Sequence, residues 1–415
     1  KVWTMSFWVK RANLGTGQRI ISRRTGGGST TATMGFLVTT DQFDFYDPSN
    51  GGQLITDAVF RDSSAWYNFV INYEASNSIQ SERLRIYVNG TRQTFTTNVA
   101  ISDANGNFNA AVVHAIGKYQ YNNTEYLDGY LAEIVWIDGT ALDPSSFAEE
   151  NENGIWIPKD VSELTFGTNG FHIDGRDSAD LGDDESGNGN DFTTSGLAAH
   201  DQVSDSPSNN FCTYNSIQLQ SGATLSDGNL DAVSSGSSWR NVHSTIGVSS
   251  GKWYWEVKAD VIDSTESCIA GIQETSFESK SNYWWQAGYT ASTSGIVFGV
   301  LHNNYKVTNT TRTSFTHDIA QGDIVQFQLN LDDNELTVLV DGVSKGKIYD
   351  ITADTEYTPA VCLYNTSSAT INFGQEGTFG GTETAGGNSD GNGVGNFKYS
   401  VPSGYLALCT KNLGS

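Results

Sequence analysis

The stretch RLRIYVNG at residues 83–90 decides the fold class of this 415-residue chain. Its apolar side chains at Leu84, Ile86 and Val88 alternate with more polar ones, which is the period-2 pattern of a β-strand with one buried face. The stretch ends in Asn-Gly, which suits a type I′ turn because both central residues of that turn need positive φ. We therefore predict a β-hairpin here.

The same alternation recurs from one end of the chain to the other, whereas apolar residues at helical spacing rarely extend beyond two turns. Further alternating segments stand at residues 4–10, 19–22, 35–38, 43–46, 126–137, 251–257, 323–331 and 335–340. The last of these enters Asp341-Gly342 and repeats the layout of the first hairpin. One short helix is expected over residues 141–150, with Asp143 as its cap and Pro144 at its first position. The chain is therefore predicted to be all-β.

The length favours two or three domains at roughly 150 residues each. Apolar content drops between residues 169 and 210, where Asp, Gly, Asn and Ser dominate. We expect two antiparallel β-sandwiches in tandem, at residues 1–160 and 216–415, joined by a polar connector over 161–215 with one or two strands. The polar stretch 377–395 is expected to form an exposed loop that does not join a core.

The net charge narrows the range of partners. With 23 Lys+Arg against 47 Asp+Glu, the formal net charge is −24, which opposes binding to nucleic acid and to anionic lipid. No apolar run approaches the roughly 20 residues that cross a bilayer, so neither nucleic acid binding nor membrane insertion is expected. The chain starts inside a predicted strand at Lys1, without a Met or a signal peptide, and we expect further sequence upstream and downstream.

Ordered segments of the second half resemble a SPRY domain. They are GKWYWEV at 251–257, AGI at 270–272, QGDIV at 321–325, the turn at 341–342, TPAVCLY at 358–364 and TINFG at 370–374. The resemblance implies a bent sandwich of two sheets, without catalytic machinery, that binds through the loops between its strands.

The first half resembles a laminin-G-like sandwich of the concanavalin A-like lectins, a jelly-roll type of fold, through residues 3–10, 87–90 and 127–134. The tract DESGNGND at 184–191 is similar to a turn of that superfamily, although there it lies near the start of a domain and here it follows the last strands. The whole order resembles virion appendage proteins of marine tailed bacteriophages. That resemblance implies a place on the virion surface, with other virion proteins and host-surface glycan as partners and a homotrimer as one expected assembly.

Three patterns in the sequence are candidates for catalysis, and each has a structural interpretation. GVSKG at 342–346 satisfies G-x-S-x-G, but a nucleophile elbow needs a helix after Ser344, whereas a strand is expected there. The Glu-x-Asp-x-x-Glu run that would place two carboxylates of a glucanase on one strand is absent from the chain. The six histidines stand singly, at positions 114, 172, 200, 243, 302 and 317. We therefore expect no catalytic residues, no cofactor and no enzyme activity.

The four cysteines and the acidic tract are the candidate metal ligands of the sequence. Cys212, Cys268, Cys362 and Cys409 lack C-x-x-C spacing, and buried free thiols are expected. Hard oxygen ligands of the kind that Ca²⁺ prefers gather at Asp180, Asp183, Asp184, Glu185, Asn188, Asn190 and Asp191. The same residue types form Asx and Gly turns that bond their own backbone. The turn is the preferred interpretation, no metal is expected, and calcium binding by this tract is kept as an alternative.

The densest aromatic cluster is Tyr283-Trp284-Trp285, which is expected between strands. Aromatic faces stack on sugar rings or anchor protein contacts, so these three residues form the candidate ligand site. Alternation would place Trp284 inward and Tyr283 and Trp285 on the other face. The alternative role of the three residues is therefore to pack the core of the sandwich.

Taken together, the residues and the resemblances predict a non-catalytic structural and adhesive protein of a bacteriophage particle, such as a fibre, spike or other appendage. It would bind host-surface glycan or neighbouring virion proteins through loops on rigid sheets. Two alternatives stay open, a carbohydrate-binding module of a secreted bacterial protein and a polysaccharide-cleaving enzyme.

Overall fold

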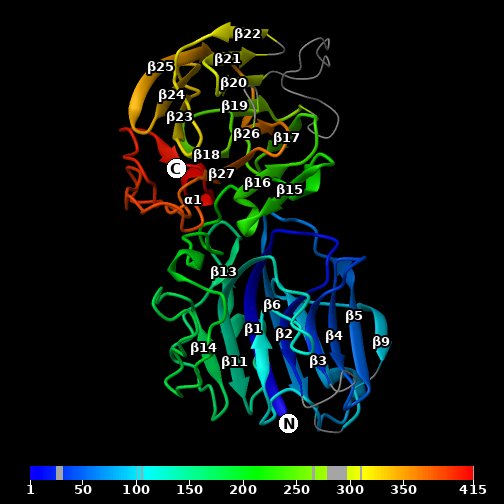
Figure 1. Cartoon of the computed structure of the whole chain (residues 1–415). Helices are drawn as coiled ribbons and strands as arrows, with labels where there is room; N and C mark the ends of the chain where they lie inside the picture. Colours follow the sequence, from blue (N-terminus) through cyan, green and yellow to red (C-terminus); the bar gives the residue numbers. More distant parts are fainter. Residues whose placement is uncertain are drawn as a thin grey trace. The chain divides into compact units, whose positions relative to one another are not determined.

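The computed structural model describes residues 1–24, 31–99, 101–103, 106–263, 267–277, 297–308 and 311–414. Within these ranges the chain is built from mainly antiparallel β-sheets and one four-residue α-helix, which confirms the all-β prediction (Figure 1). It divides into two compact units, Lys1–Gln202 and Val203–Ser415. The tract 161–215 therefore has its first part in unit 1 and its last part in unit 2. None of the helices in the described ranges has the length and apolar character of a membrane-spanning segment.

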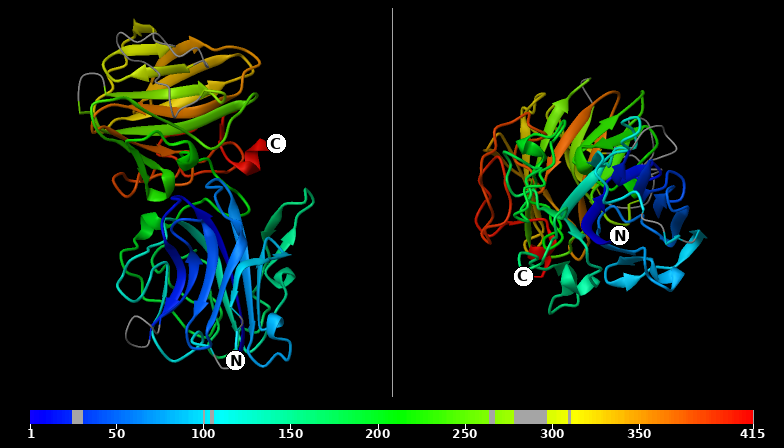
Figure 2. Two further views of the ribbon diagram at one scale, coloured as in Figure 1. Left: turned by 90° about the vertical axis from the view of Figure 1, so that its right-hand side faces the viewer. Right: turned by 90° about the horizontal axis from the view of Figure 1, so that it is seen from below.

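Unit 1 is a sandwich of two six-stranded sheets with one additional hairpin (Figure 1, Figure 2). Sheet A has the strand order β14 (Phe171–Ile173), β11 (Gly129–Asp138), β1 (Val2–Arg11), β6 (Trp66–Glu74), β7 (Leu84–Val88) and β8 (Thr91–Arg92). Sheet B has the order β10 (His114–Ile116), β2 (Gln18–Arg23), β3 (Ala32–Phe36), β4 (Gln42–Asp47), β5 (Gly52–Val59) and β9 (Phe95–Val99). The hairpin pairs β12 (Ala148–Glu150) with β13 (Trp156–Pro158).

Alternation along β1 explains the core of unit 1. Trp3, Met5, Phe7 and Val9 are buried in one cluster with apolar residues of sheet B. On the other face of sheet A, Val135 and its neighbours pack with Phe147, Val161 and Phe166 in a second cluster. The segment that follows β11 therefore covers the outer face of sheet A, whereas the outer face of sheet B carries polar side chains.

The predicted helix over residues 141–150 is wrong. The chain forms a single 3₁₀ turn, η3 (Pro144–Ser146), followed by strand β12, and Asp143 makes no capping hydrogen bond with its side chain. Phe147 is buried in the cluster on sheet A and Ala148 pairs with Pro158, so packing and pairing override the local helix signal. The remaining 3₁₀ turns of the described ranges are η2 (Gln80–Glu82), η4 (Ala199–Asp201), η5 (Ser216–Gln218) and η6 (Asp227–Asn229).

Unit 2 is also a two-sheet sandwich. Sheet C has the order β15 (Ala223–Ser226), β16 (Asp231–Ser234), β27 (Ser368–Asn372), β18 (Lys252–Val261), β23 (Ile324–Asn330), β24 (Glu335–Val340) and β25 (Val343–Asp350), with β28 (Leu406–Ala407) parallel to β18. Sheet D has the order β17 (Arg240–His243), β26 (Tyr357–Leu363), β19 (Cys268–Glu274), β20 (Val297–Leu301), β21 (Tyr305–Thr308) and β22 (Thr311–Ser314). The helix α1 is Thr410–Leu413.

Both predicted hairpins are confirmed. Asn89 and Gly90 have φ of 44° and 74° between β7 and β8, and Asp341 and Gly342 have φ of 47° and 76° between β24 and β25. Positive φ at both central residues is the type I′ geometry that these dipeptides favour.

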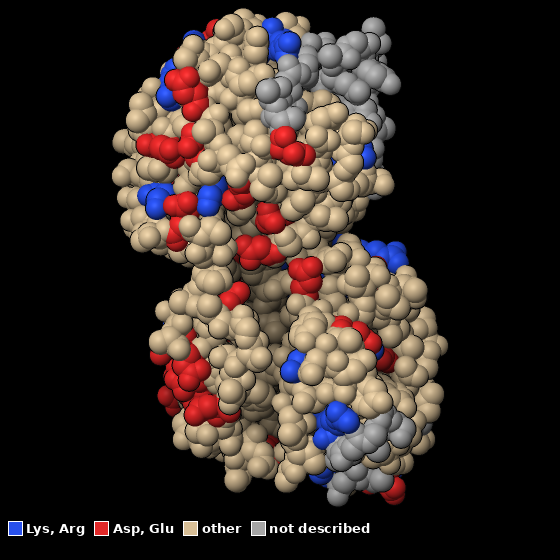
Figure 3. Space-filling model, viewed as in Figure 1, with Lys and Arg blue, Asp and Glu red and all other residues tan. Residues whose placement is uncertain are grey.

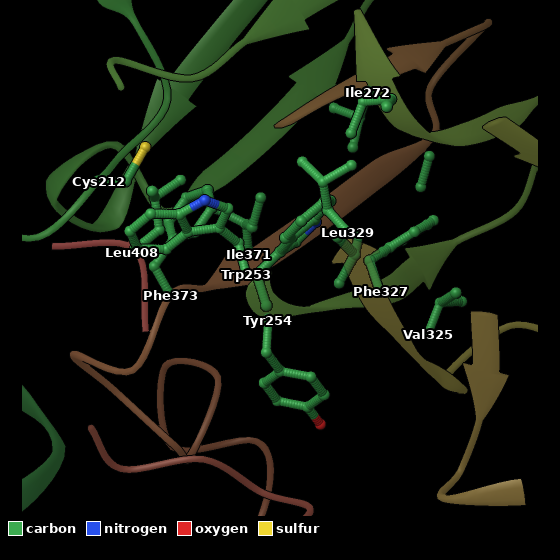
Figure 4. Packing of buried hydrophobic residues seen from close by; sticks show 14 of the residues in the cluster. Cys212, Trp253, Tyr254, Ile272, Val325, Phe327, Leu329, Ile371, Phe373 and Leu408 are labelled. Carbon is green, nitrogen blue, oxygen red and sulfur yellow. The ribbon is translucent and has the colours of Figure 1, made fainter. Parts of the chain in front are cut away.

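The core of unit 2 lies between sheets C and D. Figure 4 shows Phe327 and Leu329 of β23 grouped with Ile371 of β27 and Ile272 of β19. Tyr254 points out of this group, toward the segment that follows β27 (Figure 4). Its ring meets the ring of Phe397 edge-on, with centroids 5.0 Å apart.

Residues 377–395 form a largely exposed loop, as expected, but the expectation that this loop joins no core is wrong. Phe379 and Val394 within this stretch are buried, and the segment packs over the outer face of sheet C. The stretch can be polar and still packed because Asp390 accepts hydrogen bonds from the amides of Asn392, Val394 and Ala407 and from the side chain of Asn412. Its polar groups are thus satisfied within the unit.

Candidate binding face on sheet B

Strand β4 turns two polar side chains outward. Phe43 and Phe45 are fully buried in the core of unit 1, so Asp44 and Tyr46 lie on the outer face of sheet B. Asp44 pairs with Gly35 of β3, which pairs with Arg19 of β2, so the three residues form one row across the sheet.

Arg19 reaches Asp44 because Gly35 has no side chain between them. The Arg19 Nη1 lies 3.5 Å from the Asp44 Oδ2, and its Nε donates to the Glu125 Oε2 at 2.6 Å. Gln53 of β5 donates to the other Asp44 oxygen at 3.0 Å. These contacts fix four polar side chains on neighbouring strands and on one loop.

The loop of residues 117–127 forms one border of this face. The backbone amide of Arg19 donates to the Glu125 carbonyl at 3.0 Å, and Tyr119 pairs with Thr124 in an isolated bridge. The Arg19 guanidinium lies over the Tyr119 ring at 5.9 Å. Glu125 has a φ of 50°, which is uncommon for a residue with a side chain and is held by these contacts.

We call this set the Asp44 face, and it consists of Arg19, Asp44, Tyr46, Gln53, Tyr119 and Glu125. Tyr46 is 39% exposed, whereas Asp44 is only 3% exposed. Burial raises the pKa of Asp44, while hydrogen bonds from Gln53 and Arg19 act in the opposite direction. A ligand would therefore meet Tyr46, Gln53 and Glu125 first, with Arg19 and Asp44 holding them in place.

The chemistry of the face suits a polyhydroxylated ligand. A tyrosine ring offers an apolar surface with a polar edge, and the Gln53 amide and Glu125 carboxylate can donate to and accept from hydroxyl groups. Tyr46 and Gln53 are held by strands β4 and β5, and Glu125 is held on its loop by the contact with Arg19, which lowers the entropy lost on binding.

The predicted site residues Tyr283, Trp284 and Trp285 lie outside the described residues. Their role in ligand binding stays a prediction. In the sequence they stand in the connection between β19 and β20, two strands that pair with each other.

The acidic tract after β14 forms a turn that bonds its own backbone. The Asp184 carboxylate accepts the amides of His172 and Ser186, at 2.8 and 2.9 Å, and that of Asn190 at 2.8 Å. Burial alone would raise the pKa of Asp184, but these amide donors outweigh it and lower the pKa. Among the other candidate calcium ligands, the Asn188 side chain donates to two backbone carbonyls and the Asp191 carboxylate accepts the Asp184 amide at 3.1 Å. The remaining candidates are Asp180, Asp183, Glu185 and Asn190.

The turn interpretation of this tract is therefore favoured over a calcium site. Among the residues that the structure describes, no group of three or more His, Cys, Asp or Glu side chains is arranged to hold a metal ion.

The remaining candidates have structural contacts. Ser344 follows the hairpin turn on β25, and its Oγ accepts the amide of Gly346 at 3.3 Å. All four cysteines are free and buried, as predicted. One contact was not foreseen: the His172 Nε2 lies 2.8 Å from the Glu133 Oε2, at a bulge of β11 where Glu133 has a φ of 48°.

The Asp44 face was missed because its members come from distant segments. Arg19 and Glu125 are 106 positions apart in the chain. One signal could have found part of it: in FDFY at residues 43–46, two buried phenylalanines imply that Asp44 and Tyr46 share the opposite face.

Comparisons with known proteins agree with this architecture. Residues 1–146 match the family model of the concanavalin A-like lectin/glucanases superfamily, and residues 252–376 match the model of the SPRY domain. No curated protein matches the chain.

Solved structures similar to the chain include the SPRY domain of human HERC1, with 17% identity and a TM-score of 0.32, over 38% of this chain and 96% of that chain. The PSpry domain of TRIM65 has 15% identity and a TM-score of 0.31, over 39% and 89%. Stonustoxin has 17% identity and a TM-score of 0.32, over 39% of this chain and 27% of its own. With the two family matches and the two sandwiches, this chain carries a concanavalin A-like domain followed by a SPRY domain.

Proposed function

We propose that this chain is a non-catalytic adhesive protein whose first unit binds glycan through the Asp44 face. The observation that supports the proposal is the arrangement of Tyr46, Gln53 and Glu125 around a fixed Arg19–Asp44 contact on an outer sheet face. Hydrogen-bonding groups beside an aromatic ring are the features with which proteins orient polar ligands. Binding alone would account for all of these features, without a reacting group.

We further propose that the protein is displayed on a bacteriophage particle as a fibre, spike or other appendage, where it contacts other virion proteins and host-surface glycan. The support is the order of the two domains, which resembles that of virion appendage proteins. Several copies on one particle, for example in a homotrimer, would turn weak glycan contacts into high avidity.

Binding is tested with the whole chain on a glycan array, followed by calorimetry with the glycans that bind. We expect Tyr46→Ala and Gln53→Ala each to weaken binding about tenfold or more, since each removes a contact at the centre of the face. Gln80→Ala is the matched control, because Gln80 is an exposed glutamine of η2 in the same unit. Unchanged binding by both face variants would refute the Asp44 face as the glycan site.

The non-catalytic role and the location are tested separately. Release of reducing ends from a glycan that binds would refute a purely adhesive role. Gold-labelled antibodies against the chain should decorate the outside of intact virions, and their absence from purified particles would refute the proposed location.

A further inference from the structure

Arg240 is a partly exposed arginine of unit 2 without an acidic partner in the described structure. Its Nη1 donates to the carbonyl of the preceding residue, Trp239, at 3.4 Å. No carboxylate oxygen of the described residues lies within 4.0 Å of its guanidinium. This is unusual in a chain with 47 acidic and 23 basic residues, whose drawn face shows more acidic than basic side chains (Figure 3).

The position of Arg240 is fixed without an ion pair. Arg240 begins β17, and the backbone of Gly222 packs against its guanidinium: a Cβ at Gly222 would lie 2.4 Å from the Arg240 Nε and 2.8 Å from its Nη2. The Nε is buried and has no acceptor among the described residues. Gly222 has a φ of 93°, so the turn that supports the guanidinium needs a glycine for its conformation as well.

Gly222 also holds a serine-rich loop near Arg240. The Gly222 carbonyl accepts the amide of Ser235 at 2.8 Å and its hydroxyl at 3.0 Å. Ser235 and Ser237 are exposed. The ring of Trp239, next to Arg240 in the chain, lies 5.4 Å from that of Tyr364, which is partly exposed. Hydroxyl groups, an aromatic pair and a guanidinium are thus gathered at one edge of sheet D.

The Arg240 guanidinium, packed against Gly222, is suited to bind the carboxylate of a ligand. A partly desolvated charge without a counter-charge is unfavourable, and a carboxylate is the group that the planar fork of arginine binds most specifically. Arg11 of unit 1 shows the satisfied arrangement, because its Nη2 lies 3.0 Å from Asp41 and its Nη1 donates to the Phe60 carbonyl.

We propose that Arg240 anchors a second binding site, in unit 2, for the carboxylate of a uronic acid in an acidic saccharide. The exposed serine hydroxyls favour a saccharide over an acidic peptide. This site is separate from the Asp44 face and does not depend on it.

The test uses the whole chain and a hexamer of galacturonic acid in calorimetric titrations. We expect the hexamer to bind to the unaltered protein, and Arg240→Gln to weaken binding about tenfold or more. Arg312→Gln is the matched control, since Arg312 is an exposed arginine of β22 in the same unit, over the ring of Tyr305. Equal losses in both variants would show general charge attraction and overturn the proposal.

A change in the ligand makes the test independent of the folding of any variant. The hexamer whose carboxylates have been reduced to hydroxyls should bind to the unaltered protein about tenfold more weakly or not at all. Equal affinity for the two hexamers, or no binding of the acidic one, would overturn the proposal. Tighter binding of hexaglutamate than of the galacturonate hexamer would overturn the assignment to a saccharide.

Discussion

The Glu256 carboxylate on β18 accepts the backbone amide of Tyr399 at 2.8 Å, although 143 positions separate the two residues in the chain. The same carboxylate accepts the Lys398 amide at 3.0 Å, the Tyr254 hydroxyl at 3.0 Å and the Asn372 side chain at 3.1 Å. Four donors therefore converge on one fully buried side chain. Glu256 thus fixes the segment that covers the outer face of sheet C.

Replacing Glu256 by Gln should destabilise unit 2. The new NH₂ group would face donors in place of an acceptor, which leaves at least one buried donor unsatisfied. We expect a loss of about 2–3 kcal/mol in the free energy of unfolding, measured by urea denaturation. Hydrogen exchange at one of the Lys398 and Tyr399 amides should accelerate as well, because they bond different oxygens of Glu256 and the amide that faces the new NH₂ group loses its acceptor.

The matched control for this change is Glu335→Gln. Glu335 of β24 forms an ion pair with Lys347 at 3.0 Å, and both side chains are about two-fifths exposed. Exposed ion pairs contribute little, so this variant should stay within about 0.5 kcal/mol of the unaltered protein. If Glu256→Gln were as stable as Glu335→Gln, the proposed role of the buried carboxylate would be wrong.

The acid stability of unit 1 should depend on Asp41. Burial would raise the pKa of this carboxyl, but hydrogen bonds from the Gly15 amide, Arg61 and Arg11 outweigh it and lower the pKa. A carboxyl with a lowered pKa contributes stability that is present above its unfolded value of about 3.9 and is lost as the pH falls through the folded value. We therefore expect unit 1 to lose stability below about pH 4.

Asp41→Asn tests this dependence in urea titrations between neutral and strongly acidic pH. The variant should be less stable at pH 7, because the fully buried side chain of Arg11 loses its counter-charge, and its stability should fall less steeply in acid. Asp57→Asn, at an exposed residue of β5, is the control for the loss of a carboxylate. If the free energy of unfolding of Asp41→Asn fell with decreasing pH as steeply as that of the unaltered protein, Asp41 would not be the source of the acid dependence.

Local turn chemistry and alternation were sufficient to predict the fold class. The turn at Asn89 has the φ that its dipeptide favours, and the inward residues of β1 are those at every second position. These features depend on neighbours in the chain, which the sequence displays directly. The segment 377–395 depends instead on distant partners such as Glu256, so its polar composition predicted an exposed loop.

The Asp44 face could likewise be predicted only in part from the sequence. The alternation of Asp44 with Phe43 and Phe45 predicts an outward carboxylate, but its approach to Arg19 depends on the strand order β2-β3-β4 and on a bulge in the pairing of β2 with β3. Strand order is set by packing of the whole sandwich. No local signal in the sequence indicates it, which is why Arg19 and Glu125 were not identified.

The buried cysteines should be unreactive in the folded protein. Burial, together with the charge of Asp260, raises the pKa of Cys268 to about 12. Because the thiolate is the reactive form, a disulfide reagent at pH 8 should modify no cysteine rapidly in the native state and all four after denaturation. Rapid modification of any of the four in the native protein would contradict the burial of the thiols.

Gly35 should be essential both to sheet B and to the Asp44 face. A Cβ at Gly35 would lie 2.1 Å from the Gln18 carbonyl oxygen and 2.8 Å from the Arg19 Cα, and these backbone atoms directly precede the bulge of β2. A methyl group there would also stand between Arg19 and Asp44, which face each other across the strand that contains Gly35.

We expect Gly35→Ala to reduce the free energy of unfolding by about 3 kcal/mol or more in urea titrations, since a contact of this kind requires the backbone to shift. Glycan binding through the Asp44 face should be lost in any variant protein that remains folded, because Arg19 can no longer reach Asp44. Gly391→Ala is the control, as a Cβ at Gly391 would meet no atom within 4 Å. Equal stability of the two variants would show that sheet B can relax around the added methyl group. The close packing of β2 on β3 would then not be the reason why position 35 needs a glycine.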